Sequence, residues 1–190
     1  MSYYKTNMQL TIINSLFAAK ERELKTLVGN LQAQDVKDDN HFQRTVKKIK
    51  RQILLTPVTF GDPKISRHNQ TTQQVPSNYQ NILGGTREIF VVTVDFPFTG
   101  SPKLFEVVPS GVSVPMGRIY QPAGNSVSVE VTINTLDKNQ AISEAQNSMG
   151  TTFAIIKGNN PQAENCSQGK EPVIHSLLKD KRKEILDFYS

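Results

Sequence analysis

The sequence has little of what marks several common classes of protein. It contains one cysteine and no tryptophan in 190 residues, which excludes a disulfide framework and a cysteine-rich zinc site. Its longest apolar runs have about five residues, whereas a helix that crosses a bilayer needs about 20. The first residues lack the apolar segment of a secretory signal peptide. We therefore expect a cytoplasmic protein that does not enter a membrane.

The sequence motifs of catalytic and cofactor-binding sites are also missing. There is no phosphate-binding loop, no dinucleotide-binding glycine motif and no serine-hydrolase elbow. The histidines are His41, His68 and His175, and none has the spacing of a metal ligand relative to a cysteine or a carboxylate. Cys166 lies in a polar stretch, which is typical of a bystander thiol. The sequence thus predicts no catalytic residue, no metal and no cofactor.

Three carboxylates leave one enzymatic alternative open. Asp95, Glu106 and Glu130 fall on or near predicted strands, and clustered carboxylates could hold the divalent metal of a nuclease. No lysine follows Glu106 or Glu130 at the spacing of a restriction-type nuclease site. Solvated acids on a sheet face are the favoured interpretation. A metal-dependent nuclease therefore ranks last of three hypotheses for the function.

What the sequence does have is an excess of positive charge, a formal net charge of +5. Residues 40–54 are predicted to form a helix whose apolar positions recur every three or four residues. The opposite face carries five cations and no acid: Arg44, Lys47, Lys48, Lys50 and Arg51. Such a face is usually only solvated, but it can also neutralise phosphates. These five residues are the candidate contacts to DNA, RNA or another polyanion.

Residues 6–37 are predicted to form another helix, with a narrow apolar stripe that Gly29-Asn30 interrupts. A narrow stripe packs either against the rest of the domain or against a second copy of the chain. If it pairs two copies, the interface residues are Ile13, Leu16, Phe17, Leu24, Leu27 and Leu31.

Strand patterns dominate the middle of the sequence. Residues 87–96 are apolar on both faces, which predicts a central strand that Pro97 and the Gly100-Ser101-Pro102 turn end. Gly124-Asn125 predicts a two-residue hairpin turn before a half-solvated antiparallel strand. That strand is predicted at residues 127–133. Two shorter strands are predicted before it, at residues 104–108 and 112–120. The polar stretch 66–86 shows no periodicity and is predicted to be a long loop.

Helical patterns return in the last third, over residues 137–156 and 172–188, with a turn predicted at Gly-Asn-Asn-Pro between them. The order of helices, strands and helices predicts an α+β fold, a small antiparallel sheet with N-terminal and C-terminal helices packed on it. We expect residues 1–56 to form an N-terminal helical region and residues 57–190 a β-core with C-terminal helices, together one structural unit.

One segment resembles a known group of proteins. Residues 89–111 read Ile-Phe-Val-Val-Thr-Val-Asp-Phe-Pro-Phe-Thr-Gly-Ser-Pro-Lys-Leu-Phe-Glu-Val-Val-Pro-Ser-Gly. In certain bacterial proteins a similar strand leads into Pro-Phe-x-Gly-x-Pro-x-Leu-Phe, a Pro-Ser pair and a hairpin, and two helices follow that end in a basic stretch like residues 181–186 here. The resemblance covers roughly residues 87–187 and leaves out the helices before residue 57.

In that group the module looks like an N-terminal region joined to a separate effector, such as a restriction-endonuclease-like or Toll/interleukin-receptor-like domain, in a phage-defence setting. The resemblance implies no catalytic residue. The leading hypothesis is therefore a non-enzymatic sensor, scaffold or assembly module of a bacterial anti-phage defence protein. It would associate with itself as a homo-oligomer or with an effector. The alternative is a nucleic-acid-binding module that uses the basic helix at residues 44–51.

Overall fold

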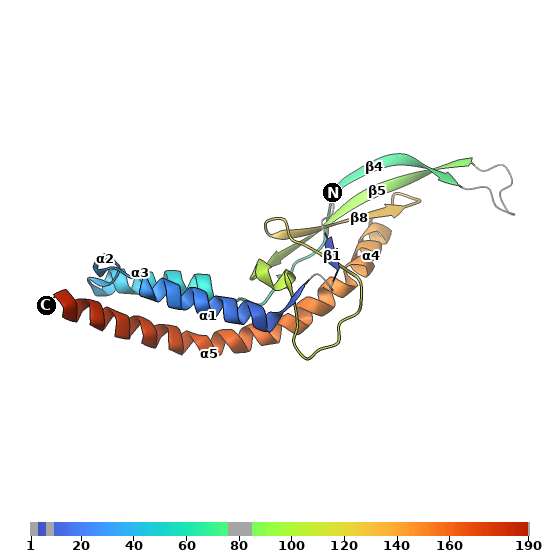
Figure 1. Cartoon of the computed structure of the whole chain (residues 1–190). Coiled ribbons are helices and arrows are strands. Elements are labelled where there is room, and N and C mark those ends of the chain that lie inside the picture. The colour runs from blue at the N-terminus through green and yellow to red at the C-terminus, as the bar shows by residue number, and fades with distance from the viewer. Residues whose placement is uncertain (1–3, 7–9, 76–84, 190) are drawn as a thin grey trace.

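The structure is a computed structural model that describes residues 4–6, 10–75 and 85–189. Its elements in chain order are β1 (Tyr4–Thr6), β2 (Thr11–Ile12), α1 (Ile13–Gly29), α2 (Ala33–Val36), α3 (Asp39–Ile53), β3 (Thr59–Phe60), β4 (Lys64–Val75), β5 (Gly85–Thr99), the 3₁₀ helix η2 (Pro102–Phe105), β6 (Val107–Val108), β7 (Arg118–Tyr120), β8 (Ser126–Ile133), α4 (Lys138–Ser148) and α5 (Gly150–Tyr189). The molecule is elongated, with α1, α3 and α5 side by side at one end and the sheet at the other (Figure 1). The predicted α+β class, with a small antiparallel sheet and helices at both ends of the chain, is confirmed.

The central strand of the sheet is β5, as the sequence predicted. It pairs antiparallel with β4 on one side and with β8 on the other, where Phe90 lies opposite Ile133. At its end β5 also pairs with β3. Pro97 lies inside β5, which continues to Thr99 and ends at the predicted Gly100-Ser101-Pro102 turn. The hairpin turn at Gly124-Asn125 is confirmed, since the flanking Ala123 and Ser126 form an antiparallel bridge.

The polar stretch 66–86, predicted as a loop, is largely strand. β4 runs antiparallel to β5 from the pair Lys64–Asp95 to the pair Val75–Gly85, and residues 76–84 lie outside the described residues. The side chains of residues 66–74 are all exposed. Because neither face of this part of β4 is buried, the apolar alternation that reveals a strand in a sequence is missing. Figure 1 shows the β4–β5 ribbon extending beyond β8.

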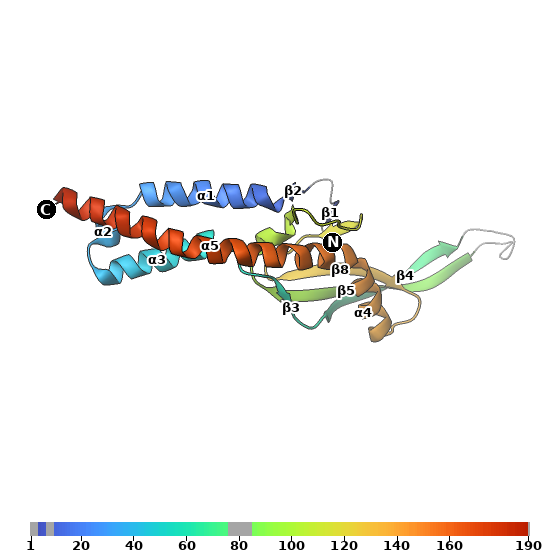
Figure 2. The same cartoon turned by 90° about the horizontal axis from the view of Figure 1, so that it is seen from below.

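The sheet packs on α4 and the first part of α5, which cross the same side of it (Figure 2). Alternate side chains of β5 and β8 point into this layer, which we call the β core. Its members include Val92, Val94, Phe96, Val127, Val129, Ala141, Ala145, Met149 and Ile156. The predicted half-solvated strand, now β8, is confirmed by its alternating burial.

A second apolar cluster, the helical core, joins the far end of α5 to α1, α2 and α3. It consists of Leu24, Val36, Phe42, Val46, Ile49, Ile53, Ile174, Leu178 and Ile185. α5 thus belongs to both cores, and its last half packs on the N-terminal helices rather than on the sheet. Within the described part of the chain, no helix combines the length and apolar character that crossing a bilayer requires.

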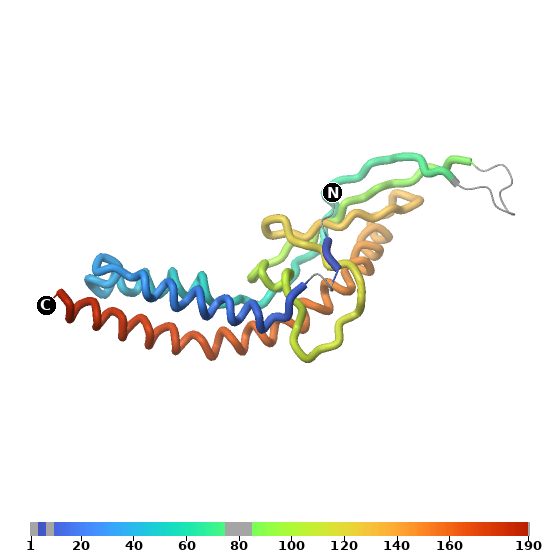
Figure 3. Tube along the Cα trace, in the orientation of Figure 1, coloured from blue at the N-terminus to red at the C-terminus, as the bar shows by residue number. Residues whose placement is uncertain are grey.

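The predicted helix at residues 137–156 is divided between α4, which ends at Ser148, and α5, which begins at Gly150. α5 then continues as one 40-residue helix through the predicted turn and the second predicted helix. Figure 3 shows it unbroken, curving from the sheet to the far end of the three helices. The Asn159 amide donates to the carbonyls of Leu104 and Val107, at 2.8 and 2.9 Å. The Asn160 side chain donates to the Val58 carbonyl and accepts from the Val58 amide, both at 2.8 Å. These contacts from outside the helix outweigh the local turn preference of Gly-Asn-Asn-Pro.

Three other predicted boundaries are wrong. The first helix begins at Ile13 rather than residue 6, because β2 pairs in parallel with β6 just before it, and it ends at Gly29. Residues 104–108 form the end of η2 and the short β6 instead of one strand. Of residues 112–120, only β7 is a strand, and it pairs with β1. In each case a pairing distant in sequence decided the local structure.

Candidate polyanion interface on α3

The helix that carries the predicted basic face is well defined. Asp38 caps α3 by accepting from the backbone N–H of His41 at 2.9 Å. This bond, together with the contact between the carboxylate and the His41 ring, lowers the pKa of Asp38 to about 2. Phe42, Val46, Ile49 and Ile53 are buried in the helical core, as their spacing predicted. The opposite face of α3 is thereby held in solvent.

Four of the five predicted cations share that solvent face. Arg44, Lys47, Lys48 and Arg51 are exposed, and we call them the cationic stripe. Their spacing of three, four and seven residues puts them on one side of the helix over about 10 Å. With Gln52 they line a surface depression of about 370 Å³. None of the four forms an ion pair with any residue that the structure describes.

The fifth cation, Lys50, turns away from the stripe toward α5. Its ammonium lies 2.7 Å from a carboxylate oxygen of Glu171. The hydrogen bond from Lys50 holds the pKa of the Glu171 carboxyl below its ordinary value, so the acid stays ionised. The structure therefore separates Lys50 from the other candidate contacts and places it at the edge of a neighbouring groove.

This α3–α5 groove encloses about 570 Å³ next to the stripe. Its lining residues are Lys50, Gln168, Glu171, Pro172, His175, Ser176 and Lys179. Six of these come from α5, and sequence reasoning did not connect any of them with the basic helix. Contacts between residues more than one hundred positions apart leave no periodic signal in a single sequence. Only the basic character of residues 179–183 hinted that a second helix adds positive charge here.

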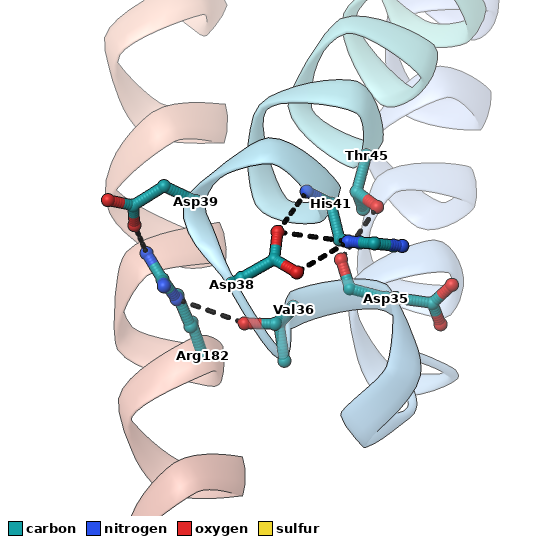
Figure 4. Close-up of polar contacts among 7 residues, drawn as sticks. All are labelled: Asp35, Val36, Asp38, Asp39, His41, Thr45 and Arg182. Atoms are coloured by element: carbon teal, nitrogen blue, oxygen red, sulfur yellow. Dashed lines mark hydrogen bonds and ion pairs between the residues drawn. The ribbon is translucent and has the colours of Figure 1, made fainter.

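Polar contacts join α5 to the α2–α3 turn at a corner drawn in Figure 4. Arg182 of α5 donates to the Val36 carbonyl at 3.1 Å and forms an ion pair with Asp39 at 2.7 Å. Its guanidinium also lies 4.8 Å from the centre of the Phe42 ring. On the other side of the corner, Thr45 donates to the carbonyl of Asp35 at 3.0 Å. These contacts fix the position of α5 beside α3, and with it the groove.

The predicted self-association stripe is used inside the chain. Of the two possibilities that its pattern left open, the structure shows packing against the domain. The six residues divide between the two cores, with Ile13, Leu16 and Phe17 on the β core and Leu24, Leu27 and Leu31 on the helical core. Ile13 and Leu24 are buried, so these two side chains are not available to a partner in this conformation.

The carboxylates considered for a nuclease do not come together as one group. Asp95 on β5 accepts from the Ser128 hydroxyl at 2.6 Å, and Glu130 lies on the same sheet face of β8. Glu106 follows η2 and pairs with Lys103 instead. Among the described residues, no three His, Cys, Asp or Glu side chains are placed to hold a metal ion.

Cys166 is half-buried in α5. Its burial raises the pKa of the thiol. A raised pKa is the opposite of what activates a cysteine nucleophile. Cys166 therefore adds no chemistry to the surface formed by α3 and α5.

Comparison with known proteins found no matching family model, no matching curated protein and no matching solved structure. The case for a function rests on the residues of this chain.

Proposed function

We propose that this chain is a non-enzymatic nucleic-acid-binding module, and that the phosphate backbone lies along the cationic stripe of α3. The observation that carries the proposal is the set of four exposed cations on one helix face, without an ion pair to any described residue. Five cations and one acid give α3 a net charge of +4, out of +5 for the whole chain. The excess charge of the protein is therefore concentrated on one helix.

The like charges on this face repel one another and destabilise the helix unless an anion binds between them. Arg44 and Lys48 stand four residues apart, as do Lys47 and Arg51, and like charges at this spacing destabilise a helix by a few tenths of a kcal/mol per pair. On α1, by contrast, Lys20 pairs with Glu23 and Lys25 with Glu21. A polyanion would turn the repulsion on α3 into attraction, with release of counterions from the phosphates.

The test is fluorescence anisotropy of a labelled oligonucleotide, single-stranded and duplex, at about 50 mM salt. We expect binding by the natural chain and its loss in the variant K47E/K48E/R51E. The control R67E/K138E/K157E makes the same change in net charge on exposed positions at the sheet end, and it should still bind. Circular dichroism must show that both variants keep their helices. Absence of binding by the natural chain at low salt would refute the proposal.

A second candidate is the assembly or scaffold module of a bacterial phage-defence protein, which the resemblance of residues 89–111 suggests. Exposed apolar side chains on α5 favour it. Val173 and Leu177 are 49% and 37% exposed beside a groove between α1 and α5, and Phe188 is 82% exposed farther along. A surface of this kind is typical of protein contacts.

Its test is the mass in solution, by light scattering, alone and with a candidate effector. An oligomer or complex that V173D/L177D disrupts would support assembly. A natural chain that stays monomeric and binds no effector would count against it.

A further inference from the structure

The α3–α5 groove opens directly beside the cationic stripe. Lys50 lines the groove, and on α3 it lies three residues after Lys47 and next to Arg51. A nucleic-acid backbone held on the stripe would therefore run along the same helix that borders the groove. The volume of about 570 Å³ falls in the range of small-ligand pockets and has room for one nucleotide.

The groove contains one aromatic side chain, His175. Its ring is half-buried and packs edge-to-face on Phe42, with 6.5 Å between ring centres and 64° between ring planes. Rings held in this way serve as stacking platforms for unpaired bases, because every base has a π-face. A base inside a duplex is already stacked and paired, so only single-stranded nucleic acid can supply one.

The polar groups of the groove select among bases. The ionised Glu171 carboxylate accepts hydrogen bonds and donates none, and Lys50 occupies only part of its capacity. Glutamate accepts from the exocyclic amino group of cytosine, and a glutamine amide such as that of Gln168 matches adenine. Uracil and thymine carry a carbonyl oxygen where cytosine has its amino group, and that oxygen would face the carboxylate unfavourably.

We infer that the α3–α5 groove takes one base of a single-stranded nucleic acid, with preference for a base that carries an exocyclic amino group. This inference rests on the proposed function, since the stripe supplies the phosphate contacts. Glu171 acts as the acceptor that selects the base, and His175 as the ring on which the base stacks.

The test compares cytosine and uracil oligonucleotides of about 15 nucleotides, which differ in the amino or carbonyl group at one ring position and in the hydrogen on the neighbouring ring nitrogen. We expect cytosine to bind about 5- to 10-fold more tightly, in DNA and RNA forms measured separately. The tighter form identifies the natural strand. E171Q should bring the cytosine-to-uracil ratio of affinities close to one. The control E184Q also removes a lysine partner on α5 but lies away from the groove, and it should keep the preference.

His175→Ala should weaken both oligonucleotides about 5- to 10-fold and leave heparin, which has no bases, unaffected. His175→Phe should restore the binding, and circular dichroism must show that both His175 variants keep their helices. Equal affinity for cytosine and uracil, with binding that still depends on the stripe, would overturn this inference and leave the proposed function standing. Failure of every oligonucleotide to bind at low salt would overturn both.

Discussion

Replacing Asn159 by alanine should lower the free energy of unfolding by about 2–4 kcal/mol, although alanine is the better helix former. Asn159 is fully buried in the first part of α5. Its side-chain N–H groups donate to two carbonyls outside the helix, those of Leu104 and Val107. Both acceptor residues are themselves buried, so no solvent replaces the lost donors.

The magnitude follows from the groups left without a partner. A buried carbonyl that loses its hydrogen bond costs about 1–3 kcal/mol, and Asn159→Ala leaves two of them. The missing amide also leaves a cavity, which adds about 1 kcal/mol. The higher helix propensity of alanine returns about 0.5 kcal/mol. Removal of the Asn159 Oδ1, which is buried without a hydrogen-bond partner among the described residues, returns about 1–2 kcal/mol more. Exposed Asn165, six residues further along α5, is the matched control, and Asn165→Ala should be neutral or slightly stabilising.

The measurement is urea denaturation followed by far-ultraviolet circular dichroism, with both variants compared to the natural chain. A loss below about 1 kcal/mol for Asn159→Ala would refute the reasoning, because the two hydrogen bonds would then not hold α5 to the segment after β5. Equal losses at Asn159 and Asn165 would likewise show that burial of Asn159 is not the cause.

Three further predictions concern charge, backbone and pH. If the four stripe residues contact phosphates, raising the salt from about 50 to 200 mM should weaken single-stranded binding roughly 50-fold, measured as the slope of affinity against salt. Gly100 has φ +102°, and a Cβ there would overlap the Pro57 carbonyl, so Gly100→Ala should cost about 3 kcal/mol or more by urea denaturation. Gly111 has φ +68° and open space around it, so Gly111→Ala should lower the free energy of unfolding by only about 1 kcal/mol in the same measurement. Because the pKa of Asp38 is lower in the folded chain than its ordinary 3.8, its ionised form stabilises the fold above pH 3.8, and that contribution is lost as the pH falls toward 2. The variant Asp38→Asn keeps a capping oxygen but has no carboxyl to titrate, so its acid unfolding should not show this loss of stability between pH 3.8 and 2.

The candidate site was partly visible in the sequence. The cationic stripe could be found because its members lie within seven residues of one helix, where spacing alone decides which side chains share a face. The groove could not, since Lys50 and Glu171 are 121 residues apart and meet because α5 packs on α3 in the helical core and Arg182 contacts the α2–α3 corner.

The strands show the same division. β8 was predicted correctly because one of its faces is buried and the other solvated, which produces strict alternation. Most of β4 was taken for a loop because its side chains from residue 66 to 74 face solvent on both sides, and its hydrogen bonds to β5 leave no trace in side-chain polarity.

The sequence by itself determined the α+β class, the buried face of α3 with the cations opposite it, and β5 as the central strand. Each of these is a matter of local periodicity, which one helix or strand expresses alone. The tertiary structure decided the rest. Asn159 and Asn160 form hydrogen bonds to backbone groups distant in sequence, and these bonds keep α5 helical through a sequence typical of a turn. The apolar stripe of α1 packs on the two cores of the same chain. Contacts between distant segments outweigh local preferences of a few tenths of a kcal/mol per residue, and a single sequence does not reveal which segments meet.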